Sequence, residues 1–101
     1  MGPCVVTRDE VPDPHARGIK LTLSCEVMQD ANTRDLIFRI PDLIAYLSSI
    51  VPLESGDIIS TGTPPGVGLG RTPQRWLQDN EEMFIAIDRI DTLRNRTRAI
   101  A

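Results

Sequence analysis

Residues 56–70, with the sequence GDIISTGTPPGVGLG, constrain the fold of this chain more than any other segment. A short β-branched run, 56–60, leads into a loop with four glycines and two adjacent prolines. Glycine permits backbone conformations that a Cβ would block, whereas Pro64 and Pro65 fix φ and remove two amide donors. The loop is therefore built to hold one shape. Two interpretations stay open at this point: a ligand-contacting loop or a tight structural crossover.

The chain has 101 residues, which is enough for one small domain or part of one. Hydrophobic residues make up 41% and charged residues 25%, which is typical of a globular protein. The formal charge of −3 and only four aromatic residues argue against nucleic acid as a partner. Arg94, Arg96 and Arg98 alternate, which predicts one strand face, either solvated or an anion patch.

The sequence contains no apolar run of membrane-spanning length and no signal-peptide pattern, so we expect a cytoplasmic protein without a membrane partner. Cys4 and Cys25 lack the spacing of a zinc site and are expected to be reduced, packed thiols. His15 lies in a proline-containing loop and is expected to be solvated rather than catalytic.

Hydrophobic periodicity predicts an α+β protein that is mostly β, with one amphipathic helix near 41–51. Pro41 suits its first turn, Pro52 stops it, and its apolar face is expected to pack on a sheet. The residues from Lys20 to Gln29 alternate as one long strand or a hairpin, with Leu21, Leu23, Cys25 and Val27 on one side. Further strands are expected at 4–7, 36–38, 56–60, 83–87 and 92–100, with a turn at 88–91.

Several familiar sites are excluded or weakened by their spacing. The glycines at 66, 68 and 70 are followed by Arg71-Thr72-Pro73, which supplies neither the helix of a dinucleotide site nor the Gly-Lys of a phosphate loop. No serine lies in a nucleophile elbow. Glu81 and Glu82 are neighbours on a strand, so they point to opposite faces and cannot readily chelate one metal.

What remains is Thr61 and Thr63, followed by loop amides. A hydroxyl and a few amides can bind a carboxylate or an enolate oxygen, but they cannot transfer a proton unaided near neutral pH. The loop therefore looks like half of a site.

These residues resemble the C-terminal part of the fumarylacetoacetate hydrolase family, which includes acylpyruvate hydrolases, oxaloacetate decarboxylases and hydroxyhepta-dienedioate isomerases. The likeness runs through nearly the whole chain, at VPDP (11–14), NTRDLIF (32–38), LIAYLS (43–48), LESGDIISTGTPPGVGLG (53–70) and TLRNR (92–96). The block from Gly56 to Gly68 is the most specific of these motifs.

The resemblance implies part of a mixed β-sandwich or roll, a homodimer, and an enzyme that uses Mg²⁺ or Mn²⁺ to act on a 2-oxo or 1,3-dioxo acid. It implies substrate contact by Thr63, flanked by Gly62 and Pro64. The family's metal ligands and catalytic Glu/His pair match no position here, so residues 1–101 are expected to be the C-terminal segment of such a catalytic domain, inactive alone. A non-catalytic module for dimerisation or scaffolding stays the alternative, and nucleotide binding a weaker one.

Three positions depart from the family pattern, at Ser24-Cys25, Asn80-Glu81 and Asp91, where many members have glycine. A Cys at a hairpin tip would be strained by a positive φ. We expect these changes to affect local stability rather than the loop around Thr63.

Overall fold

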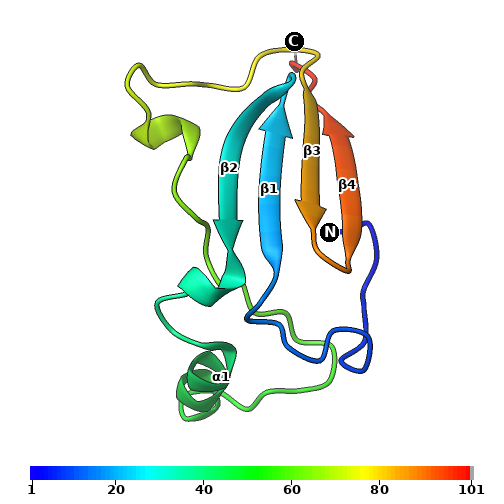
Figure 1. The fold of residues 1–101 in the computed structure, drawn as a ribbon. Coiled ribbons are helices and arrows are strands. Elements are labelled where there is room, and N and C mark those ends of the chain that lie inside the picture. The colour runs from blue at the N-terminus through cyan, green and yellow to red at the C-terminus, as the bar shows by residue number, and fades with distance from the viewer. Residues whose placement is uncertain (101) are drawn as a thin grey trace.

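In the computed structural model, which describes residues 1–100, the chain forms one antiparallel sheet with an α-helix beyond its end (Figure 1). The four strands lie in the order β2-β1-β3-β4. The elements are β1 (Gly18–Leu23), β2 (Glu26–Asn32), the 3-10 helix η1 (Thr33–Asp35), α1 (Ile40–Ser48), the 3-10 helix η2 (Gly68–Gly70), β3 (Glu82–Ile87) and β4 (Asp91–Arg96). The predicted α+β, mostly β, class is confirmed.

The alternating run from Lys20 to Gln29 is a hairpin, whose tip is Ser24-Cys25. Leu21 pairs with Gln29 and Thr22 with Val27, so Met28 is the extra residue of a β-bulge. The bulge buries Met28, whereas Val27 and Cys25 are exposed. The prediction that Cys25 and Val27 lie on one side with Leu21 and Leu23 was therefore wrong, because simple alternation does not survive a tight turn and a bulge.

Non-glycine residues adopt positive φ at all three departures from the family pattern. Cys25 has φ 69°, Asn80 has φ 63° and Asp91 has φ 103°. Asparagine and aspartate tolerate this region better than cysteine does. The expected strain at the hairpin tip is present.

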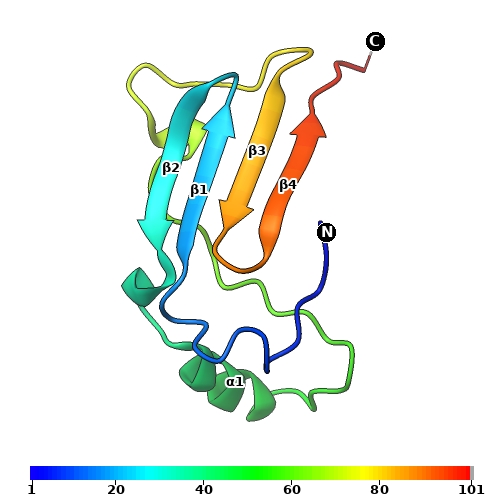
Figure 2. The ribbon, with the colours of Figure 1, turned by 45° about the vertical axis from the view of Figure 1, so that its right-hand side comes forward.

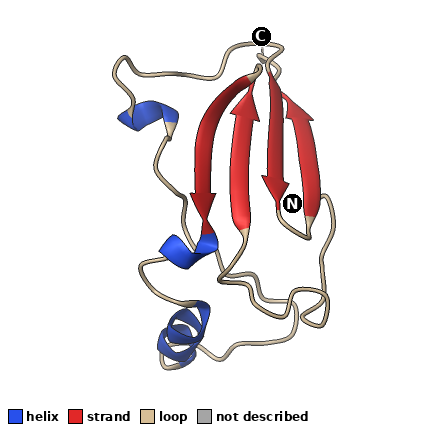
Figure 3. Ribbon diagram, in the orientation of Figure 1, coloured by secondary structure: helices blue, strands red, loops and turns tan. Residues whose placement is uncertain are grey.

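Three expected strands are absent from the described residues, at 4–7, 36–38 and 56–60. A strand needs an edge to pair with, and in this chain these apolar segments run outside the sheet as loops (Figure 3). The predicted strand at 83–87 is β3, and the strand at 92–100 is β4, which ends earlier, at Arg96.

The helix α1 begins at Ile40 and ends at Ser48, earlier than the predicted boundary at 51. Pro41 lies in its first turn, as expected. The prediction that α1 packs its apolar face on a sheet was wrong, because α1 lies past the end of the strands in both views (Figures 1 and 2). Ile44 is 43% exposed, and no residue of α1 is buried.

We call residues 36–78 the arm. The arm contains α1, η2 and the glycine-rich loop, and it passes beside β2 before returning to β3 (Figure 1). It carries twelve of the sixteen large apolar residues that are exposed. These are Ile37, Phe38, Ile44, Tyr46, Ile50, Val51, Leu53, Ile58, Val67, Leu69, Trp76 and Leu77.

The surface is larger than a compact protein of this size would have. The accessible area is 8060 Å², whereas a folded monomer of 11.2 kDa exposes about 5,700 Å². The radius of gyration is 15.7 Å, against about 12.7 Å for a compact chain of this length. Among residues 1–100, the buried apolar residues are only Val11, Leu23 and Met28. Much of the arm therefore presents apolar surface of the kind that a larger core covers.

Candidate functional site

A cavity of about 650 Å³ lies between the glycine-rich loop, the end of β2 and the start of α1. Residues 61–65 form one wall, and this wall includes Thr61, Gly62, Thr63 and Pro64. The rest of the lining is mixed: Leu36, Ile37, Phe38 and Leu43 are apolar, whereas Asp30 and Asp35 contribute carboxylates. The structure thus places the sequence-predicted site residues Gly62, Thr63 and Pro64 together in the lining of one cavity.

Gln29 of β2 holds the loop at Thr63. Its side-chain Nε2 donates to Thr63 Oγ1 at 3.0 Å and to the Pro64 carbonyl at 2.7 Å. Gln29 faces the loop because the bulge at Met28 sets its register on β2. Sequence reasoning missed Gln29, which it placed at the end of the alternating run without a role. The local signal is an uncharged amide at the end of an apolar alternation.

Arg71 holds the loop at its other end. Its guanidinium donates to the Met28 carbonyl at 2.6 Å and to the Gly66 carbonyl at 3.1 Å, and Glu26 lies 3.7 Å away. Gly66 has φ +108°, and a Cβ there would lie 2.2 Å from the Met28 carbonyl oxygen. Glycine is therefore required at 66 by both conformation and space. The loop is rigid, as its composition predicts.

The start of α1 is capped by His15. The Ile40 amide donates to His15 Nε2 at 3.1 Å, and the His15 side chain is only 16% exposed. The expectation that His15 is solvated was wrong. An imidazole nitrogen here satisfies one of the amides that the first turn of a helix leaves without a partner. His15 thus helps to fix the helix that carries Leu43 to the cavity.

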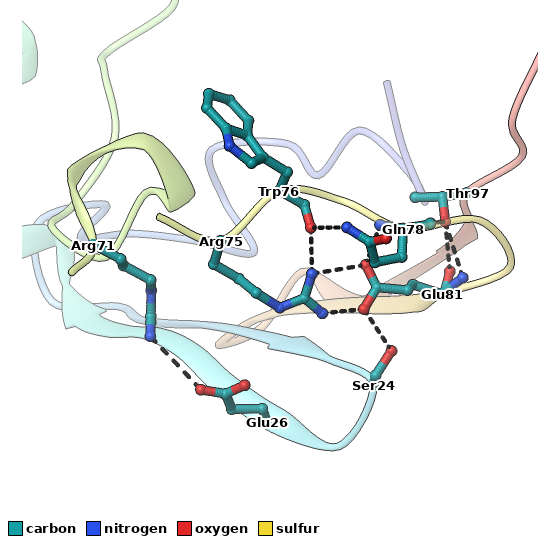
Figure 4. Close-up of polar contacts among 8 residues, drawn as sticks. All are labelled: Ser24, Glu26, Arg71, Arg75, Trp76, Gln78, Glu81 and Thr97. Carbon is teal, nitrogen blue, oxygen red and sulfur yellow. Dashed lines mark hydrogen bonds and ion pairs between the residues drawn. The ribbon is translucent and has the colours of Figure 1, made fainter. Parts of the chain in front are cut away.

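A second polar cluster links the last residues of the arm, just before β3, to the sheet (Figure 4). Glu81 is only 8% exposed, and its carboxylate is paired with the Arg75 guanidinium. It also accepts from the Gln78 amide at 2.6 Å and from Ser24 Oγ at 3.2 Å. Hydrogen bonding from Arg75, followed by that from the Gln78 amide, holds the pKa of Glu81 below its ordinary value. The cluster is structural, because its charges are mutually satisfied.

The alternating arginines of β4 are also paired. Arg94 and Arg96 both bind the Glu82 carboxylate, and the Arg94 guanidinium lies 5.4 Å from the centre of the Phe84 ring. These hydrogen bonds, with Arg96 as the largest cause, lower the pKa of Glu82. Glu81 precedes β3 rather than lying on it, and the two neighbouring carboxylates have different partners, Arg75 for Glu81 and Arg94 with Arg96 for Glu82. The two arginines therefore neutralise a carboxylate rather than form a free anion patch.

The residues present do not fit a divalent cation. Within residues 1–100, no group of three or more His, Cys, Asp or Glu side chains is close enough to hold a metal. Of the two carboxylates that line the cavity, Asp30 is paired with Lys20 at 3.0 Å, and Asp35 accepts a hydrogen bond from the Asn32 amide at 3.3 Å. Both cysteines are free and exposed, so the prediction of packed thiols was wrong.

The glycines after 66 do not open a helix. Gly68–Gly70 is a single 3-10 turn, and a Cβ at Gly68 would lie 1.9 Å from the Arg75 carbonyl oxygen. A dinucleotide site needs a helix N-terminus at this position. The loop geometry therefore gives no support to nucleotide binding. Across the described residues, no helix has the length and apolar character that would let it cross a membrane.

Comparison with known proteins identifies the class to which this fold and loop belong. The sequence profile of the fumarylacetoacetate hydrolase C-terminal domain matches residues 1–98, so the chain belongs to that family. An uncharacterized protein of Staphylococcus aureus strain USA300, SAUSA300_0871, is 46% identical over 93 residues, which are 92% of this chain and 31% of that protein.

Solved structures agree. A Mycobacterium smegmatis protein with the provisional name HpcE superposes with a TM-score of 0.93 at 42% identity, over 97% of this chain and 36% of that one. Maleylpyruvate hydrolase from Sphingobium sp. SYK-6, crystallised with manganese(II) and pyruvate, gives a TM-score of 0.86 at 38% identity, over 96% of this chain and 34% of the enzyme. This chain spans about a third of the length of these relatives.

Proposed function

We propose that residues 1–101 are the C-terminal segment of a metal-dependent enzyme of this family that acts on 2-oxo or 1,3-dioxo acids. The observation that carries the proposal is the cavity lined by residues 61–65, where Gln29 holds the Thr63 hydroxyl and apolar side chains form part of the remaining lining. A small 2-oxo acid has an anionic end that suits a hydroxyl donor and an organic tail that suits apolar side chains. The complex of the related maleylpyruvate hydrolase with manganese(II) and pyruvate supports this class of ligand.

In this proposal, the Thr63 hydroxyl donates a hydrogen bond to a carboxylate or oxo oxygen of the substrate. Thr61, Gly62 and Thr63 also carry backbone amides, whereas Pro64 and Pro65 carry none, so within residues 61–65 the amide donors all precede Pro64. Donors already fixed in place stabilise developing negative charge without reorganisation. The divalent cation, Mg²⁺ or Mn²⁺, is held by groups outside the described residues, and so is the proton-transfer machinery.

The exposed apolar surface supports the same view of an incomplete catalytic unit. The excess of roughly 2,400 Å² over a compact monomer of this mass exceeds the area buried by a standard protein interface. We propose that the remaining two thirds of the enzyme cover the arm, and that a second copy completes a homodimer.

A chimera tests the proposal. This chain replaces the matching third of the Sphingobium maleylpyruvate hydrolase, and maleylpyruvate hydrolysis is measured with Mn²⁺ for the chimera and for the isolated 101-residue chain. We expect turnover by the chimera and none by the isolated chain. Turnover by the isolated chain above a Thr63→Val control would show that no further segment is needed. A folded chimera that binds Mn²⁺ but has no activity would favour the non-catalytic module.

A further inference from the structure

The orientation of the Gln29 side chain is determined by the Pro64 carbonyl. A carbonyl oxygen can only accept a hydrogen bond, so the Gln29 atom 2.7 Å from it must be the amide nitrogen, Nε2. The second Nε2 proton is directed at Thr63 Oγ1, 3.0 Å away. Gln29 therefore donates to both loop groups, and Thr63 Oγ1 is an acceptor in this contact.

This contact determines what the Thr63 hydroxyl can do. With one lone pair engaged by Gln29, the hydroxyl proton is left to donate. The acceptor within the loop is the Pro64 carbonyl at 3.4 Å, a long contact to an oxygen that already accepts from Gln29. An anionic oxygen in the cavity is a better partner, because hydrogen bonds to charged acceptors are stronger.

We infer that Gln29 is a positioning residue that makes the Thr63 hydroxyl a hydrogen-bond donor toward an anionic oxygen of the ligand in the 61–65 cavity. This inference rests on the proposed function and extends it. It says in which direction the Thr63 hydroxyl donates its hydrogen bond and which residue sets that direction. Gln29 itself does not touch the ligand in this account.

The support for Gln29 is rigid. It follows Met28, whose carbonyl is bound by Arg71 at 2.6 Å, so two consecutive residues of β2 hold both ends of the loop. Gln29 is half-buried and pairs with Leu21 in the sheet. Its amide is thus presented by the sheet rather than by the loop that it orients, as precise positioning requires.

Two substitutions separate positioning from simple attachment of the loop. Gln29→Met keeps the length of the side chain but removes both donors, so the Thr63 hydroxyl is free to rotate. Gln29→Glu places an acceptor against Thr63 Oγ1, so the hydroxyl donates to Glu and turns away from the cavity. The matched control is Gln74→Met, because Gln74 lies on the same arm, and its Nε2 donates to the Leu69 carbonyl at 3.3 Å.

The experiment measures pyruvate binding to the Mn²⁺-loaded chimera by calorimetry, together with Mn²⁺ affinity and thermal melting. We expect Gln29→Met to weaken pyruvate about fivefold and Gln29→Glu about 30-fold or more, which are the losses expected for a hydrogen bond to a charged group. Mn²⁺ affinity should stay unchanged, whereas the melting temperature should fall in both Gln29 variants, because both lose the hydrogen bonds that hold the loop. Gln74→Met should bind pyruvate like the parent.

Pyruvate binding by Gln29→Met within twofold of the parent would overturn the inference. A parallel loss of Mn²⁺ affinity would also overturn it, because the effect would then reach beyond the hydroxyl that Gln29 orients. Thr63→Val distinguishes the two proposals. If Thr63→Val weakens pyruvate and Gln29→Met does not, the inference alone fails; if Thr63→Val has no effect, the proposed function fails.

Discussion

The sheet and the arm are held in place by different kinds of hydrogen bond. Each strand of the sheet pairs with a neighbour inside the chain, and β1 and β3 pair on both sides. The arm has only short helices. Side chains of the sheet and its flanking loops hold it, namely Gln29, His15 and Glu81, and its own Arg71 binds the Met28 carbonyl of β2. The sheet is thus a self-contained scaffold, whereas the arm is a shaped segment with most of its apolar side chains exposed. The candidate site lies where the two meet.

The largest expected effect is in the buried part of the sheet. Leu23 is 4% exposed and Ile58 in the arm is 69% exposed. Leu23→Ala should lower the free energy of unfolding of the 101-residue chain by about 3 kcal/mol, and Ile58→Ala by less than about 0.5 kcal/mol. Urea denaturation followed by circular dichroism measures both. Equal losses of unfolding free energy would mean that the arm contributes to the core of the isolated chain as much as the sheet does, which would contradict the difference between the two regions.

A second pair of substitutions tests how the arm is attached. Gly66→Ala should cost about 2–3 kcal/mol, because a Cβ at φ +108° would lie 2.2 Å from the Met28 carbonyl oxygen. Gly62→Ala is the control: its φ is +96°, but nothing lies within 4 Å of the added Cβ, and about 1 kcal/mol is expected.

Limited trypsin digestion after Arg71 and Arg75 measures how firmly this part of the arm is held against the sheet. We expect Gly66→Ala to speed cleavage at both sites while the strands stay protected. Cleavage rates that match those of Gly62→Ala would show that the close approach to Met28 does not hold the loop.

A smaller effect is expected from pH. The pKa of Glu81 is held below its ordinary value near 4.5 when the chain is folded. Its contribution to stability is therefore complete above that value and is lost as the pH falls through 4.5 and then through the lowered pKa. Glu81→Gln should be less stable than the parent at pH 6, and its stability should fall less steeply between pH 6 and pH 3.

Urea midpoints across this range provide the measurement. The control is Glu82→Gln, which removes an ion pair inside the sheet rather than the link between arm and sheet. Only Glu81→Gln should also release the 71–80 segment to trypsin at neutral pH. Release by both variants would show that the link is not specific to Glu81.

The sheet was predictable from the sequence because alternation reports a half-buried face directly. Met83, Ile85 and Ile87 gave β3, and Pro41 gave the start of α1. The missing strand at 56–60 was not predictable, because an apolar run says nothing about whether a partner edge is available. The bulge at Met28 was not predicted either, since it depends on register with β1. The contacts of Gln29 and His15 were not predicted for a related reason: their partners lie 34 and 25 residues away in sequence.

The likeness to a known family made a more specific prediction for the loop than local physics did. The residues alone left a ligand-binding loop and a structural crossover open, and the structure now places Thr63, Gly62 and Pro64 on one cavity wall. Their role as a substrate-binding group stays a prediction.

The most direct test of the central claim is the pyruvate dissociation constant of the Mn²⁺-loaded chimera with Thr63→Val, compared with Thr92→Val on the exposed face of β4. The account predicts binding weakened about tenfold or more by Thr63→Val, with Mn²⁺ affinity and melting temperature retained, and no change for Thr92→Val. Equal pyruvate affinity in the two variants would contradict the claim that the loop around Thr63 is a wall of the 2-oxo acid site.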